Sequence, residues 1–234
     1  MERLCLDDRL AAVARWVLPG ETMADIGTDH AFLPCRLVSE GICSKAVASD
    51  VAQGPYERAR QVVAEQGLSE KISVRLGSGL SVLQPKEVKT IVMAGMGGRL
   101  ICELLQAEPE VASSAGRLVL QPQRNPEHVR GWLAGHGWRI IADDLAKDGK
   151  MWYNIIVAEP GSMEVDGDAL LYGSPSPGVS PALRREWLGF CRDRFTDIAD
   201  SLRISRGRSA EARLSELEQE IARLDRIIAK EESC

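Results

Sequence analysis

Short apolar runs alternate with stretches of helical periodicity through residue 158 of the chain. The runs that predict β-strands lie near 22–26, 45–49, 72–76, 90–94 and 117–121. The stretches that predict helices lie near 6–16, 32–40, 55–66, 98–107 and 126–135. Because strands and helices alternate, we expect an α/β fold with a doubly wound, mostly parallel, Rossmann-like sheet.

Two further strands, near 138–145 and 151–158, flank the sequence Lys147-Asp148-Gly149-Lys150. An Asp-Gly pair between two strand patterns is a strong signal for a β-hairpin. We therefore expect the sheet to end in an antiparallel C-terminal hairpin.

The C-terminal part changes character. Residues 161–181 are rich in proline and glycine, which predicts a linker without a packed element. Beyond them, apolar residues recur at steps of three and four, as Leu188, Cys191, Phe195, Ile198 and Leu202, then Leu214, Leu217, Ile221, Leu224 and Ile228. The pattern predicts an antiparallel helical hairpin; a parallel dimeric coiled coil is the alternative, which Gly207 disfavours because it interrupts the phase. The expected division is a ligand-binding α/β domain over 1–160, a linker over 161–181 and a helical coiled-coil domain over 182–234.

Composition narrows the class of protein. The 234 residues are 44% hydrophobic, enough for one core and an appendage, and no apolar run approaches the length of a membrane span. The first residues lack the apolar region of a signal peptide, and the six cysteines form no C-x-x-C pair. We therefore expect a cytoplasmic protein with no metal and no membrane partner. The net charge of −5 gives no general attraction to nucleic acid, so an RNA partner would need a local basic surface.

The most informative motif is Asp25-Ile-Gly27-Thr-Asp29, directly after the first predicted strand. Asp50 ends the second strand, so these residues are expected side by side at the carboxyl edge of the sheet, where such sheets bind ligands. There, Gly27 would let a ligand approach the backbone, and Asp50 could bind a ribose diol. A turn rich in helix-capping residues is the plainer alternative for this motif.

The motif lacks the G-x-G-x-x-G sequence that seats a dinucleotide pyrophosphate. An acidic turn would repel phosphate and suits a nucleoside without one. S-adenosylmethionine fits this description, because Asp25 and Asp29 would favour its cationic end. Backbone amides at the start of the next helix would take its carboxylate.

Three other strand ends carry candidate chemistry. Residues 77–79, Gly-Ser-Gly, would let an adenine ring lie against the backbone, although a plain glycine turn is the simpler interpretation. Residues 94–98, Ala-Gly-Met-Gly-Gly, suggest that a ligand comes close to the chain, or that strand and helix pack tightly. Residues 121–125, Gln-Pro-Gln-Arg-Asn, would either contact a substrate or cap the following helix.

Together these motifs resemble the bacterial tRNA (adenine-22-N1)-methyltransferase family of class I S-adenosylmethionine-dependent enzymes. The resemblance covers essentially the full chain and is carried by Leu6-x-x-Arg9-Leu10-x-x-Val13-Ala14, Ala24-Asp-Ile-Gly-Thr-Asp-His-Ala31-x-Leu33-Pro34, Ala48-Ser-Asp50-Val-x-x-Gly54-Pro55, Arg75-Leu-Gly-x-Gly79-Leu80, Ala94-Gly-Met-Gly-Gly98, Leu120-Gln-Pro122 and Arg130-x-Trp132-Leu133. It implies a methyltransferase domain followed by a small coiled-coil domain, S-adenosylmethionine as cofactor, and methyl transfer to N1 of adenine 22 in tRNA.

Two positions depart from the family pattern. The family usually has an acid where Ser78 stands, which puts a contact to the adenine amine of the cofactor in doubt. Phe32 replaces a common tyrosine and keeps the ring without its hydroxyl. Neither change removes a reacting group.

The motifs and the resemblance give an expected site. The residues expected to bind the cofactor are Asp25, Gly27, Asp29, Asp50, Val51, Gly77, Ser78, Gly79, Ala94, Gly95, Met96 and Gly97. The expected catalytic residues are Asp29, which would stabilise a cationic adenine, His30 as a proton acceptor, and Met96 beside the reacting methyl group. A scaffold role is the alternative for His30.

Arginines supply the expected contact to tRNA. Residues 184–208 hold seven arginines against four acids, whereas 209–232 carry more acids than bases. This asymmetry predicts a phosphate-binding end at Arg206 and Arg208, completed by Arg99, Arg124 and Arg130. Salt bridges between the two helices are the alternative explanation. We expect a monomer.

Three other functions share features with this interpretation. A nicotinamide-dependent reductase would share the fold, but it should have a phosphate-binding glycine fingerprint. A methyltransferase of another RNA site, a small molecule or a protein would keep the cofactor. A non-catalytic adaptor would act through the helical hairpin.

Overall fold

A computed structural model describes residues 4–204 and 208–232. The chain divides between Pro177 and Gly178 into two compact units. The first unit contains the sheet and the second contains two long helices, and each is described by itself.

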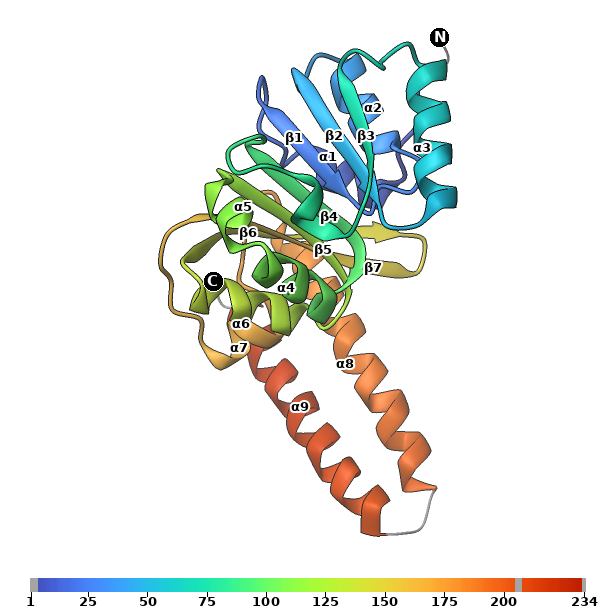
Figure 1. The fold of residues 1–234 in the computed structure, drawn as a ribbon. Helices are drawn as coiled ribbons and strands as arrows, with labels where there is room; N and C mark the ends of the chain where they lie inside the picture. Colours follow the sequence, from blue (N-terminus) through green and yellow to red (C-terminus); the bar gives the residue numbers. More distant parts are fainter. Residues whose placement is uncertain (1–3, 205–207, 233–234) are drawn as a thin grey trace. The chain divides into compact units, whose positions relative to one another are not determined.

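The first unit is built on a seven-stranded sheet with the order β3-β2-β1-β4-β5-β7-β6 (Figure 1). The strands are β1 (Thr22–Ile26), β2 (Lys45–Asp50), β3 (Ile72–Leu76), β4 (Thr90–Gly97), β5 (Arg117–Arg124), β6 (Trp138–Asp148) and β7 (Met151–Pro160). The first five run parallel, and β7 is antiparallel to both β5 and β6. The prediction of a mostly parallel sheet with an antiparallel C-terminal hairpin is confirmed.

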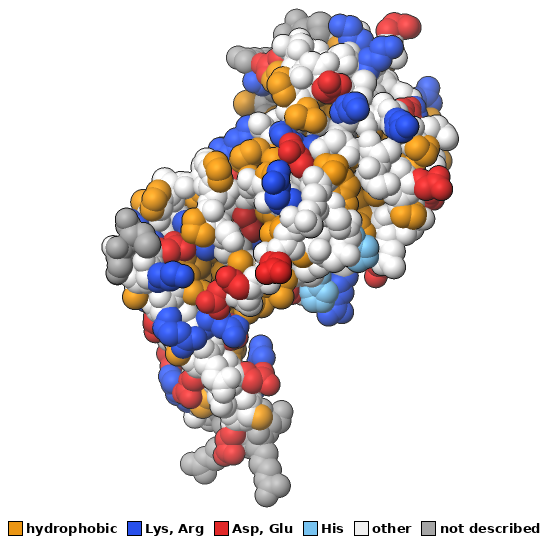
Figure 2. Space-filling view, turned by 90° about the vertical axis from the view of Figure 1, so that its left-hand side faces the viewer, with side chains coloured by type: hydrophobic (Ala, Val, Ile, Leu, Met, Phe, Trp, Pro, Cys, Tyr) orange, Lys and Arg blue, Asp and Glu red, His pale blue; other side chains and the backbone are white. Residues whose placement is uncertain are grey.

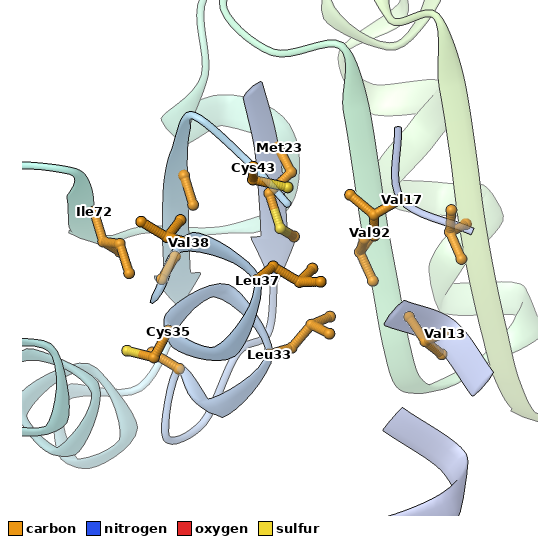
Figure 3. Close-up of a cluster of buried hydrophobic side chains, with 14 of the residues drawn as sticks. Val13, Val17, Met23, Leu33, Cys35, Leu37, Val38, Cys43, Ile72 and Val92 are labelled. Atoms are coloured by element: carbon orange, nitrogen blue, oxygen red, sulfur yellow. The ribbon is translucent and has the colours of Figure 1, made fainter. Parts of the chain in front are cut away.

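Helices cover both faces of this sheet, and the inner strands β1, β2, β4 and β5 each contain a run of at least four consecutive buried residues. The helices of the first unit are α1 (Asp8–Ala14), α2 (Phe32–Ser39), α3 (Gln53–Glu65), α4 (Gly98–Ala107), α5 (Pro109–Ser114), α6 (Pro126–Gly135) and α7 (Gly167–Tyr172), with the 3₁₀ turn η1 (Gly79–Val82). One buried cluster joins α1, α2 and α3 to the sheet, as Val13, Leu37 and Val92 show in Figure 3. A second buried cluster joins α4, α5 and α6 to the opposite face.

The segment 161–181 is more ordered than a linker. It contains α7, which begins with an Asp166 side chain that accepts a hydrogen bond from the Ala169 amide. The buried guanidinium of Arg130, on α6, donates to the carbonyls of Leu170 and Leu171 at 3.2 Å each. The expectation of a segment without a packed element was therefore wrong, because a side chain from elsewhere in the sequence caps this short helix.

The second unit is a helical hairpin of α8 (Pro181–Arg203) and α9 (Arg208–Glu232). Three ion pairs join the helices: Arg184–Glu231, Arg192–Asp225 and Arg203–Glu218. The residue numbers rise along α8 as they fall along α9, so the two helices are antiparallel within one chain, as predicted. Ile198 does not belong to the seam, because its side chain is 43% exposed whereas the neighbouring Ala199 is buried. Among the described residues, no helix is long and apolar enough to cross a bilayer.

Candidate active site

A cavity of about 430 Å³ opens at the carboxyl edge of the sheet, where the strand order reverses between β1 and β4. Its size lies in the usual range for small-molecule sites, and this edge is where doubly wound sheets bind ligands. The lining comes from α1, the β1–α2 loop and the ends of β4 and β5: Asp7, Arg9, Leu10, Asp25, Gly27, Thr28, Asp29, His30, Phe32, Leu33, Ala94, Gly95 and Gln123. Six of the residues predicted for the site therefore share one cavity: Asp25, Gly27, Asp29, His30, Ala94 and Gly95.

The β1–α2 loop is held in a fixed shape by its own hydrogen bonds. The amides of Gly27 and Thr28 both donate to the Ser49 carbonyl on β2, at 2.8 and 2.9 Å. Gly27 and Asp29 have positive φ angles of 76° and 52°. A Cβ on Gly27 would lie 2.3 Å from Cε at the flexible end of Met96, so that side chain would have to shift, and the positive φ by itself favours glycine.

Asp25 is the most electrostatically perturbed group of the cavity. Burial raises the pKa of its carboxyl from 3.8 to about 6, and Asp50 contributes in the same direction. A 2.5 Å hydrogen bond from the Thr28 hydroxyl and the positive charge of Arg9 oppose this rise. A buried carboxylate with a raised pKa gains from a cationic ligand, because the ligand's charge would favour ionisation.

Asp50 connects three strand ends. Its Oδ1 accepts from the Ala52 amide at 3.0 Å and its Oδ2 accepts from the Asp29 amide at 3.3 Å. The Gly77 amide donates to the Asp50 carbonyl at 2.9 Å. Asp50 itself does not line the cavity but lies directly beside the loop that does. Val51 and Leu76 are apolar side chains left 70% and 47% exposed at this edge, where a flat ring could cover them.

Asp29 lies at the mouth of the cavity with a 61% exposed side chain. Its Oδ1 accepts from Arg58 Nη2, on α3, at 2.8 Å, and His30 Nδ1 lies 3.8 Å away. The His30 ring packs against Phe32 with 5.1 Å between centroids. Sequence reasoning missed Arg58, because its partner lies 29 residues away and nothing local signals the pair.

The glycines of the third and fourth strand ends are explained largely by packing. A Cβ on Gly77 would meet Val82 at 2.5 Å, and one on Gly79 would meet Leu104 at 2.6 Å. A Cβ on Gly98 would lie 2.3 Å from the Asn125 carbonyl oxygen, so the start of α4 passes directly against the β5–α6 loop. Gly97 faces open space, because no heavy atom of the described residues lies within 4 Å of where its Cβ would stand. The roles of Gly77, Ser78, Gly79 and Gly97 in cofactor binding stay predictions.

Of the arginines expected to contact RNA, two lie at the carboxyl edge of the sheet, one is buried, and two belong to the helical hairpin region. Arg99 Nε donates to His128 Nε2 at 3.3 Å, and Arg124 is paired across the sheet with Gly97, so both lie at the carboxyl edge. The expectation for Arg130 was wrong, because its side chain is 1% exposed and makes two hydrogen bonds to Asp143, of 2.6 and 2.9 Å. Arg206 lies outside the described residues, and Arg208 begins α9.

Charges on the surface are mixed. On the face shown in Figure 2, lysines and arginines are interspersed with acids and apolar side chains. Within α8, Arg184, Arg192 and Arg203 are paired with acids of α9, which supports the salt-bridge explanation for these three. Total charge alone therefore does not define a track for RNA.

Arg9 and Gln121 belong to the cavity region but were not in the expected list of cofactor-binding and catalytic residues, although residues 121–125 were a candidate substrate contact. Arg9, on α1, lies among the lining residues and donates from Nη1 to Gln121 Oε1 at 3.1 Å. Gln121 is completely buried at the end of β5. Both stood in the motifs quoted above, but helical periodicity marks Arg9 only as a polar position beside the apolar stripe.

Comparisons with known proteins agree with this geometry. Residues 6–156 match the family model of a methyltransferase domain. The chain is 38% identical over 188 residues to the tRNA (adenine(22)-N(1))-methyltransferase of Bacillus subtilis, which covers 80% of this chain and 78% of that protein.

Solved structures give the same likeness. The crystal structure of the B. subtilis m1A22 tRNA methyltransferase is 30% identical, has a TM-score of 0.82 and covers 96% of this chain and 99% of that one. A Streptococcus pneumoniae candidate tRNA (m1A22) methyltransferase, solved in complex with S-adenosyl-L-methionine, is 32% identical with a TM-score of 0.82, covering 96% of this chain and 100% of that one.

Proposed function

Because the chain belongs to the methyltransferase-domain family, and within it to the family of bacterial tRNA (adenine(22)-N(1))-methyltransferases, we propose that it methylates N1 of adenine 22 in tRNA. Its methyl donor in this proposal is S-adenosylmethionine. The observation that carries the proposal is the 38% identity over 80% of the chain. Its proposed place of action is the cytoplasm, where tRNA is the substrate.

The residues present fit this cofactor. An adenosine requires a ribose-binding acid and an apolar edge, which Asp50 with Val51 and Leu76 supply. The cationic groups of its amino-acid part gain from a nearby carboxylate, which Asp25 supplies. When bound, S-adenosylmethionine supplies an activated methyl group on a sulfonium.

The chain's own task is mainly alignment. Attack along the line of N1, methyl carbon and sulfur requires the adenine to lie in the cavity, so it must leave its place in the tRNA at a cost of a few kcal/mol. Met96 lies against Gly27, and Gly97 follows it at the end of β4. In our proposal they flank the incoming base.

Asp29 is the proposed carboxylate for the positive charge that methylation places on adenine. Its side chain is exposed at the cavity mouth, and its ion pair with Arg58 can be exchanged for a ligand contact because surface ion pairs contribute only about 0–1 kcal/mol. Arg99 and Arg124 are the proposed phosphate contacts, since both lie at the same edge of the sheet.

The deciding experiment is transfer of a labelled methyl group to a tRNA transcript, followed by mapping of the modified nucleotide. We expect incorporation at adenine 22 and none into a matched transcript with guanine at that position. A methyl group on N1 blocks the base-pairing edge, so reverse transcription should stop at that nucleotide. Labelling that persists in the guanine 22 transcript would move the proposal to another RNA site. Absence of transfer despite cofactor binding would favour an adaptor.

A further inference from the structure

The backbone segments that carry Arg99 and Arg124 meet where helices α4 and α6 begin, at the carboxyl edge of the sheet. The two helices contact each other on one face of the sheet (Figure 1). A Cβ on Gly98 would lie 2.3 Å from the Asn125 carbonyl oxygen and 2.9 Å from that of Arg124, so the two helix starts are in close contact. Arg99 follows Gly98 in α4, and Gln123, next to Arg124, lines the cavity. Both arginines therefore belong to the rim beside the cavity.

A chain of hydrogen bonds sets the direction of the Arg99 side chain. Its Nε donates to His128 Nε2 at 3.3 Å. The other ring nitrogen, Nδ1, lies 3.0 Å from Glu127 Oε1, which also accepts from the Asn125 side-chain amide at 3.2 Å. A carboxylate beside Nδ1 keeps the proton of a neutral imidazole on that nitrogen, so Nε2 is left as the acceptor that Arg99 needs. His128 is thus bonded through its two ring nitrogens to one acid and one arginine.

The positive charge of Arg99 is not neutralised by a direct ion pair. Other arginines of the first unit, such as Arg75, Arg117 and Arg130, donate directly to a carboxylate. Within the described part of the chain Arg99 has no such pair, and the hydrogen bond to His128 uses Nε alone. The N–H groups of Nη1 and Nη2 therefore remain for a ligand. A guanidinium that presents these donors from a fixed position is suited to a phosphate.

The local charge also favours an anion. Arg99 and Arg124 outnumber the acid Glu127 at this place, although the whole chain has a net charge of −5. In the proposed function the target base enters the cavity while its sugar-phosphate backbone stays outside, which brings phosphates to this rim. A contact made by the His128 ring itself is the alternative, since its side chain is 41% exposed.

We propose that Arg99 binds a backbone phosphate of tRNA through Nη1 and Nη2, and that His128, held by Glu127, is a positioning residue that directs the guanidinium at this phosphate. The inference rests on tRNA as the substrate in the proposed function. It does not depend on which adenine is methylated, because a phosphate contact carries no sequence information. His128, for which sequence patterns predicted no role, becomes a determinant of tRNA affinity without touching the RNA.

The test measures binding of the full chain to a tRNA transcript at several salt concentrations, by fluorescence anisotropy and without a methyl donor. Arg99→Met should weaken binding about tenfold at low salt. It should also reduce the slope of log affinity against log salt concentration by about 0.7 to 0.9, as expected for one phosphate contact. Arg99→Lys keeps the charge but has no Nε–H for His128, so its slope should stay at the wild-type value while its affinity falls roughly three- to tenfold.

Two substitutions of His128 form a matched pair. The Oε1 of a glutamine can stand near the position of Nε2, whereas the shorter asparagine reaches only to the position of Nδ1. His128→Gln should therefore keep the wild-type affinity within about twofold, and His128→Asn should lose roughly three- to tenfold. In the Arg99→Met background His128→Asn should cause no further loss, because both residues act on one contact.

Arg139→Met is the control for loss of charge alone. Arg139 is an exposed arginine near the start of β6, which runs parallel to β5 and therefore begins at the opposite edge of the sheet. Its substitution should change the tRNA affinity by less than about twofold, because salt screens distant surface charges. Affinity for S-adenosylhomocysteine should stay at the wild-type value in every variant, which checks that each one folds.

Losses for Arg99→Met and His128→Asn that add in the double variant would show that His128 contacts the RNA itself, and would overturn the positioning role. Equal losses for His128→Gln and His128→Asn, or wild-type affinity in Arg99→Lys, would also overturn it. If His128→Asn fails the cofactor-binding check, the Arg99→Lys and His128→Gln affinities decide. Methylation mapped to another nucleotide would defeat the proposed function and leave these affinities standing, whereas additive losses would defeat this inference alone.

Discussion

At the scale of single residues, burial destabilises the ionised carboxyl of Asp25, and a cationic cofactor would offset this loss of stability. Its carboxyl is buried and its pKa is raised to about 6, so the folded protein holds a proton there that the unfolded chain releases near pH 3.8. Stability of the cofactor-free protein should therefore fall as pH rises from about 4 to 6, by roughly 3 kcal/mol for this group. Asp25→Asn keeps an oxygen for the Thr28 hydroxyl and removes the charge.

We expect Asp25→Asn to raise the free energy of unfolding at pH 7 by up to about 3 kcal/mol, and by roughly half as much at pH 5. Urea unfolding of the cofactor-free protein at both pH values measures this. Thr28→Val, which removes the opposing hydrogen bond, is the control and should not gain stability at pH 7. A gain for Asp25→Asn that is the same at both pH values would contradict the pKa assignment.

The same carboxyl should make cofactor binding depend on pH. S-adenosylhomocysteine keeps the ammonium group of the methyl donor, and if this group needs the ionised Asp25 carboxyl, the affinity should fall by up to about tenfold per pH unit below 6. In Asp25→Asn the affinity at pH 7 should be lower and this pH dependence should disappear. Calorimetric titrations between pH 5 and 8 test both statements, and a wild-type affinity that is flat across that range would refute the second.

Variants of Asp50 and Asp29 should affect different quantities, the first the affinity for the cofactor and the second the rate of methyl transfer. Asp50→Ala removes the proposed ribose contact, so we expect affinity for S-adenosylhomocysteine to fall by about 10- to 100-fold. Asp29→Ala should depress single-turnover methyl transfer more than it weakens tRNA binding. Unchanged cofactor affinity in the first variant, or a wild-type single-turnover rate in the second, would remove that residue from its proposed role.

At the scale of elements, Arg130 joins four parts of the first unit. From α6 it makes two bonds to Asp143 on β6, one to Asn154 on β7 at 3.0 Å, and two to the end of α7. Arg130→Ala leaves the buried Asp143 without its partner, so we expect a loss of about 3–5 kcal/mol in the free energy of unfolding. Arg99→Ala, at a surface arginine, should stay within about 0.5 kcal/mol. Similar losses of stability in both variants would contradict the role of Arg130 in joining α6, β6, β7 and α7.

The elements that local pattern decides were predictable from the sequence. Apolar periodicity sets the strands and helices, and the Asp-Gly turn sets the hairpin. The predicted strands therefore lie close to the observed ones. α7 was not predictable, because its C-terminal carbonyls are capped by Arg130 from 40 residues away. The strand-end acids were found because parallel strands bring their carboxyl ends together. Arg9 and Arg58 were missed, because only tertiary packing brings them to the cavity and to Asp29.

At the scale of the whole molecule, the methyltransferase match ends at residue 156 and the helical hairpin lies beyond it. The first unit contains both buried clusters of the sheet and every residue that lines the cavity. In our proposal it therefore holds what cofactor binding needs. The proposed domain division assigns the tRNA contact in part to the second unit, whose first helix is rich in arginine.

A chain ended after Pro177 tests this division. We expect its affinity for S-adenosylhomocysteine to stay within about twofold of the full chain, because the cavity is intact. Methyl transfer to tRNA should fall roughly tenfold or more, because phosphate contacts are lost. Lowering the salt concentration should also raise the rate less than in the full chain, because each phosphate contact contributes to the salt dependence of binding. Turnover on tRNA equal to that of the full chain would assign the whole RNA-binding surface to the first unit. In that case Arg99 and Arg124, at the edge of the sheet, would be the residues to vary next.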